Sequence, residues 1–132
     1  MTVMGINAVA VLVAAVAAFI FGAVYYGIMG KAWMAAQGKT IDPAKKGSPP
    51  LAALIASFVG EIAMAVVLGM MIGSPNLVLG MTTGLLAWLG FVMTTLIINH
   101  AYQGAKSALT VIDGAHWLGV LLIEGAILGA MG

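Results

Sequence analysis

Long apolar runs alternate with short polar stretches along this chain of 132 residues. The apolar runs predict four helices, at about 6–30, 51–72, 77–99 and 108–131. A helix needs roughly 20 apolar residues to cross the hydrocarbon layer of a bilayer, and each run is close to that length. We therefore expect an all-α membrane protein whose single domain, 1–132, is a bundle of four transmembrane helices.

The breaks between the runs have the chemistry of loops and turns. Residues 31–50 hold four of the five lysines, which predicts a cytoplasmic loop over this range. Near its end, Ser48 is the expected N-cap of the second helix. Residues 73–76, Gly-Ser-Pro-Asn, interrupt a long uncharged stretch with turn-forming residues. The second and third helices should therefore form a tight antiparallel hairpin.

The lysines also predict the orientation of the helices in the membrane. Short cytoplasmic loops retain positive charge, and all five lysines lie in the first and third connections. We expect both of these connections to be cytoplasmic and both termini to lie outside. The protein should be a multi-pass protein of the cytoplasmic (inner) membrane.

Composition excludes several classes of function. The chain is 63% hydrophobic and 7% charged, whereas about a quarter of the residues of a soluble domain are charged. There is no basic surface for nucleic acid and no cysteine for a thiolate site or nucleophile. We expect the lipid bilayer as the main partner, with no cofactor, no metal, no catalytic residue and no enzymatic activity.

Small residues recur at the four-residue spacing that lets membrane helices approach closely. The seams are Ala10, Ala14 and Ala18 in the first helix, Gly80 and Gly84 in the third, and Gly125 and Gly129 in the fourth. They are suited equally to packing inside one bundle and to packing between copies. Because four short helices leave little room for an internal cavity, we favour a homo-oligomer or a larger membrane complex.

Two acidic residues are expected deep in the membrane. Glu61 lies ten residues into its helix, about 15 Å deep, and Glu124 lies about 20 Å from the cytoplasmic side. An acid at the centre of a membrane helix costs on the order of 2.5–3.5 kcal/mol, so such residues are candidates for function. The pair is suited to sharing a proton or binding a cation. Alternatively, each is a protonated acid bonded to a neighbouring helix.

Asp113 and His116 extend this pattern along the fourth helix. With Glu124 they fall on one helical face, at i, i+3 and i+11. A proton or cation path needs such a series of titratable groups, but His116 and Glu124 are about 12 Å apart along the axis. A position in the headgroup zone is the simpler explanation for Asp113 and His116.

Four further residues are weaker candidates for an ion or ligand site. Asn99 and His100 end the third helix and should lie near Asp113, which raises the alternative of a metal site. Interfacial polar residues explain them better, since no ligand spacing supports a metal. Tyr25 and Tyr26 are typical of the aromatic belt at a membrane interface.

Five segments carry a resemblance to a known family: residues 5–7, 21–27, 30–34, 113–117 and 125–129. On these segments the whole chain resembles the DUF1761 family, small bacterial membrane proteins of unknown function. Members more often have Trp where Tyr25 stands. The resemblance implies four helices in the same places, and it implies no substrate, cofactor or catalytic residue.

Two hypotheses for function follow, with an intramembrane enzyme ranked last. The first is a self-associating or accessory membrane subunit without catalytic activity, based on the seams and the small extramembrane mass. The second is a proton- or cation-coupled transporter of a small solute, with Glu61 lining the path in a homo-oligomer.

Overall fold

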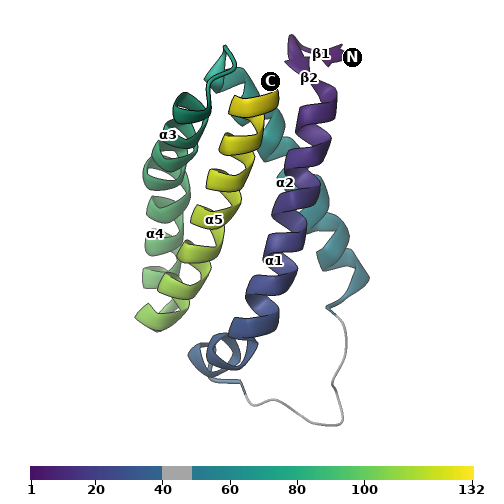
Figure 1. The fold of residues 1–132 in the computed structure, drawn as a ribbon. Helices are drawn as coiled ribbons and strands as arrows, with labels where there is room; N and C mark the ends of the chain where they lie inside the picture. Colours follow the sequence, from purple (N-terminus) through teal and green to yellow (C-terminus); the bar gives the residue numbers. More distant parts are fainter. Residues whose placement is uncertain (40–48) are drawn as a thin grey trace.

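The computed structural model describes residues 1–39 and 49–132 and consists almost entirely of helices (Figure 1). The elements in chain order are β1 (Thr2–Val3), β2 (Ile6–Asn7), α1 (Ala8–Ala36), α2 (Leu51–Ile72), α3 (Leu77–Ala87), the π-helix η2 (Trp88–Met93), α4 (Thr94–Gln103) and α5 (Ser107–Met131). α3, η2 and α4 are continuous, so they form one span. The described residues contain four spans, each long and apolar enough to cross a membrane, which confirms the predicted fold class.

α5 is the central helix of the bundle. It packs against α3 on one side and against α1 and α2 on the other, and α1 also packs against α2 (Figure 1). We call the two ends of the bundle by what they carry. The hairpin end holds β1, β2, the turn 73–76 and the end of α5, and the lysine end holds the described lysines, Lys31, Lys39 and Lys106.

Glycines bring the backbones of α3 and α5 into direct contact. A methyl group at Gly80 would meet the carbonyl oxygen of Gly125, and one at Gly125 would meet that of Gly80. Gly84 faces the carbonyl of Leu121 in the same way. The glycine seams predicted from the sequence therefore pack two helices of one chain, and they are not free for a second copy.

The alanine seam of α1 is also used inside the chain. Ala10, Ala14 and Ala18 are completely buried, and α1 packs on both α5 and α2. The core between these three helices consists of Ile6, Ala10, Val11, Ala14, Ala65, Leu68, Ile72, Leu121 and Leu128. Self-association would therefore need a different face from the one that the sequence indicated.

The first and third spans are longer at the lysine end than expected. α1 continues through residues 31–36, which are good helix formers apart from Trp33, so the connection begins after Ala36 and not at residue 31. It ends in a Schellman motif: Gly38 has φ +71°, and the Lys39 amide donates to the carbonyl of Met34. The third span likewise reaches Gln103. Ser48, the expected cap of α2, lies outside the described residues.

The structure contains two features that the sequence did not predict, a π-helix within the third span and a β-hairpin before α1. The π-helix η2 interrupts the third span, and the indole nitrogen of Trp88 donates to the carbonyl of Gly114 on α5 (2.8 Å). At the hairpin end, Met4 and Gly5 both have positive φ, as a two-residue type I′ turn requires. The resulting hairpin ends at Asn7, whose side chain caps α1.

Candidate functional site

The two membrane acids lie in the core between α1, α2 and α5. Glu61 is 2% exposed and Glu124 is 0% exposed. Glu61 shares a helical face with Ala65 and Leu68, both of which belong to that core. Glu124 lies one turn from Leu128, which belongs to it too. The same periodicity that buries the apolar residues therefore directs both carboxyl groups inward.

These carboxyl groups have almost no hydrogen-bond partners. Within the described residues, no protein group bonds Oε2 of Glu61 or either carboxyl oxygen of Glu124. A buried polar group without a partner costs about 1–3 kcal/mol, so each one requires an explanation, such as a functional role or a bound water molecule or ion. Glu61 is close enough to act electrostatically on Glu124. The two carboxyl groups are not hydrogen-bonded to each other, because both oxygens of Glu124 lack a partner among the described residues. A cation or a water molecule between them would link them.

His116 lies about two turns nearer the lysine end, in an aromatic surrounding. It is 6% exposed, and its Nδ1 has no hydrogen-bond partner among the described residues. A methyl group at Gly22 of α1 would lie 3.0 Å from its Nε2. The rings around the imidazole are Phe21 (centroids 6.0 Å apart), Tyr25 (5.6 Å), Tyr26 (4.8 Å) and Trp117 (4.6 Å).

Asp113 joins α1 to α5 through one of its carboxyl oxygens. Its Oδ1 accepts hydrogen bonds from the Tyr26 hydroxyl (2.7 Å) and from the Trp33 indole (3.0 Å). Beside it, the Tyr25 hydroxyl donates to the carbonyl of Ile112 (2.6 Å). These bonds hold the side chain of Asp113 between α1 and α5 near the lysine end.

The titratable residues of α5 therefore do not form one continuous series: Asp113 and His116 lie together, and Glu124 lies apart from them. Val120, which is 0% exposed, lies between His116 and Glu124. The axial separation of His116 and Glu124 is about 12 Å, too far for direct proton transfer without intervening water. The candidate site is the Glu61–Glu124 pair, with His116 as a neighbouring group of unassigned role.

The weaker candidates are placed apart from this pair. Asn99 is exposed, and the Nδ1 of His100 pairs with the Thr110 hydroxyl (2.8 Å) and not with Asp113. In the part of the chain that the structure describes, no group of three His, Cys, Asp or Glu residues is placed to hold a metal ion. The metal alternative for Asn99 and His100 therefore has no support in this geometry.

Sequence reasoning missed the contribution of α1 to these contacts. Trp33 was not among the candidate site residues, yet its indole bonds Asp113 together with the Tyr26 hydroxyl. The sequence did contain a sign of this contact: Tyr26 and Trp33 are seven residues apart, so they lie two turns apart on the same face of the helix. What the sequence lacked was the knowledge that α1 lies against α5.

The comparisons with known proteins concern the family alone. A family model described as a protein of unknown function, DUF1761, matches residues 9–129. Neither the curated proteins nor the solved structures gave a match. The match covers almost all of the chain and all four spans, and the chain therefore belongs to the DUF1761 family.

Proposed function

We propose that the protein is a proton- or cation-coupled transporter of a small solute, and that Glu61 and Glu124 form its coupling site. One observation carries the proposal: two buried carboxyl groups of a membrane bundle have three oxygens without a partner among the described residues. Acids placed inside the membrane are expensive, and they commonly mark proton and ion pathways.

The surroundings of the pair support reversible binding of a positive charge. α2, α3 and residues 8–30 of α1 contain no lysine, arginine or histidine that could neutralise the acids. A proton or a small cation would therefore be bound strongly only by the two carboxyl groups themselves. Its arrival or departure changes the charge at the centre of the core, and a charge change there can drive helix movement.

The solute path is proposed to lie between copies of the chain. The small cavity at the hairpin end is about 30 Å³, which is room for water and not for a solute. The third span is the least buried of the four, with large exposed side chains such as Val78 and Phe91. An assembly could use this surface to complete a path beside α2 and α5.

Carbodiimide labelling of the protein in liposomes tests the coupling site. A hydrophobic carbodiimide reacts with protonated carboxyl groups, and peptide mass spectrometry locates the adduct. We expect labelling at Glu61 or Glu124 that falls as the pH rises or as Na⁺ is added. Glu61→Gln should leave labelling at Glu124 alone, Glu124→Gln the reverse, and the double variant none. Labelling that is independent of pH and of Na⁺ would identify permanently neutral, structural acids and refute the proposal.

Solute-triggered proton movement tests the transport half of the proposal. Proteoliposomes with a trapped pH-sensitive dye would receive the low-molecular-weight fraction of a cell extract. We expect the wild-type protein to move protons in response, and Glu61→Gln to abolish the response. Normal proton movement by Glu61→Gln would exclude this residue as the coupling acid.

The exposure of the third span also favours the second candidate, an accessory subunit of a larger assembly. Only 6% of its apolar stretch is buried within the chain, against 44% for α5. Native mass spectrometry of mildly extracted protein separates the two candidates. Another polypeptide in fixed ratio supports the accessory subunit, whereas a pure homo-oligomer supports the transporter.

A further inference from the structure

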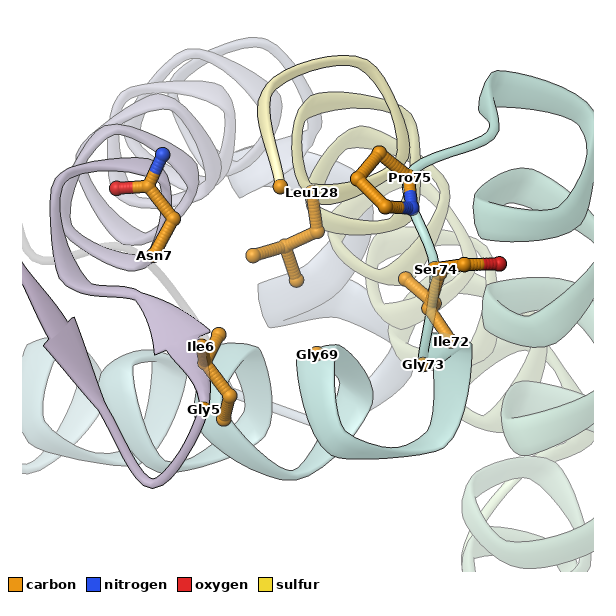
Figure 2. Close-up of a pocket in the computed structure, with 10 residues that line it drawn as sticks. Gly5, Ile6, Asn7, Gly69, Ile72, Gly73, Ser74, Pro75 and Leu128 are labelled. Carbon is orange, nitrogen blue, oxygen red and sulfur yellow. The ribbon is translucent and has the colours of Figure 1, made fainter.

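A small cavity lies at the hairpin end, between the β1–β2 hairpin, the end of α2 with the turn that follows it, and the end of α5 (Figure 2). Its volume is about 30 Å³, and one water molecule needs roughly 10–15 Å³ of such space. The lining residues are Gly5, Ile6, Asn7, Gly69, Ile72, Gly73, Ser74, Pro75, Leu128 and Gly132. Four of these ten are glycines, which leave backbone amide and carbonyl groups accessible at the wall. The cavity is therefore suited to hold about two water molecules.

Leu128 forms the wall of this cavity that faces the acid pair. Leu128, which is 2% exposed, extends into the space between α1 and α2 (Figure 2). Glu124 lies one helical turn further in on the same helix, about 6 Å along the axis. Leu68 lines the same core from α2, two turns from Glu61. Leu128 thus lies between the cavity and Glu124, whereas Glu61 lies further from the cavity, beyond Leu68 and Ala65.

The β1–β2 hairpin covers the other side of the cavity. Ile6 is 8% exposed and packs directly on Gly69 of α2, where a methyl group would lie 2.9 Å from its Cγ2. The hairpin is only two residues long in each strand, and such a short hairpin has little stability of its own. At its end, the side-chain amide of Asn7 donates to the carbonyl of Met131 (3.1 Å). The hairpin is thus held by few contacts, and Ile6 is the main one over the cavity.

We propose that this cavity is a hydrated vestibule through which Glu124 exchanges a proton or a small cation with the medium at the hairpin end, and that the hairpin is its lid. The inference rests on the proposed function, since it requires that the acid pair binds and releases a positive charge. Glu61 is the titratable group that α2 places toward Glu124. α1 over residues 8–24 and α3 contain no titratable residue, and on α5 the nearest is His116, two turns away.

A reversible lock on the lid tests the inference, because the chain contains no cysteine of its own. The Cβ atoms of Ile6→Cys and Gly69→Cys would lie within about 4.5 Å, since the Ile6 Cγ2 is about one C–C bond from its Cβ. Such a separation permits a disulfide. The double variant in liposomes would be given a pH jump, and the carboxyl infrared band of Glu124, assigned by its loss in Glu124→Gln, would be followed in time.

We expect the oxidised double variant to exchange at least about tenfold more slowly than the reduced one, and reduction to restore the rate. The two single-cysteine variants, treated with the same oxidant, control for the substitutions and for the oxidant. Ile6→Ala removes the contact with Gly69 without a disulfide and should exchange faster than the wild type. Repeating the measurement at constant pH with added Na⁺ shows whether Na⁺ displaces the proton.

The outcomes separate the two proposals. Equal rates in the oxidised and reduced double variant, with a Glu124 band that still titrates, would overturn the vestibule and leave the coupling site standing. A wild-type rate in Ile6→Ala would also contradict the lid. A Glu124 band that changes with neither pH nor Na⁺ in any variant would refute the coupling site itself, and the vestibule with it.

Discussion

Asp113 and His116 lie one turn apart on α5, and both face α1, but they differ in their hydrogen bonding. Asp113 accepts two hydrogen bonds, whereas the Nδ1 of His116 has none from the described residues. A carboxylate that accepts from a hydroxyl and an indole forms charge-assisted bonds, which are stronger than bonds between neutral groups. The contact between Asp113 and Tyr26 should therefore be among the stronger polar contacts between these two helices.

Tyr26→Phe tests that contact, because it removes the hydroxyl and keeps the ring beside His116. We expect the free energy of unfolding in mixed micelles to fall by about 1–2 kcal/mol, as for hydrogen bonds between membrane helices at the upper end of their range. Tyr25→Phe is the matched control, since its hydroxyl donates to the neutral carbonyl of Ile112. It should cost about 0.6 kcal/mol. Equal losses for the two variants would mean that the charge of Asp113 contributes nothing.

At the residue scale, the sequence predicted how deep the polar residues lie in the membrane, but it did not predict which residues they contact. Glu61 and Glu124 are conspicuous in the sequence because a charge in a long apolar run is costly wherever the helix lies. Whether the two acids meet depends on which helices are neighbours, and apolar helices carry little information about that. The pairing of Asp113 with Tyr26 was hidden for the same reason, since it joins residues 87 positions apart.

The helices themselves were largely predictable, because the period and length of an apolar run determine a membrane span. α2 and the start of α3 lie where the sequence placed them, and the turn 73–76 separates them. The π-helix and the hairpin were missed for different reasons. A π-helix depends on one extra residue in a turn, which leaves no pattern in the sequence, and the signal of the hairpin, Met4-Gly5, is short and includes a residue rarely found at positive φ.

The close packing of α3 on α5 requires glycines, which have no side chain, at the contact. The substitution Gly125→Ala tests this requirement. The new methyl group would meet the backbone of Gly80, so the two helices must separate. We expect a loss of about 1–3 kcal/mol in the free energy of unfolding in mixed micelles. Gly27→Ala is the matched control, because its new methyl group would have nothing within 4 Å and alanine is the better helix former. A loss for Gly27→Ala as large as that for Gly125→Ala would contradict close packing as the cause.

At the scale of the whole molecule, the two ends of the bundle differ in charge. Among the described residues, Lys31, Lys39 and Lys106 all lie at the lysine end, and the hairpin end carries no lysine. Lysine-rich short connections remain in the cytoplasm, so the hairpin end should face outward. The vestibule proposed above would then open to the outside, and the acid pair would exchange with the external medium.

Single cysteines in this cysteine-free chain test the orientation directly. Ser74→Cys lies in the exposed turn at the hairpin end, and Ser107→Cys lies exposed at the lysine end. With a membrane-impermeant maleimide on intact cells, we expect Ser74→Cys to be labelled and Ser107→Cys to be labelled only after permeabilisation. The wild-type chain, which has no thiol, gives the background. The reverse pattern would place the hairpin end in the cytoplasm, and the vestibule would then supply Glu124 with protons from inside the cell.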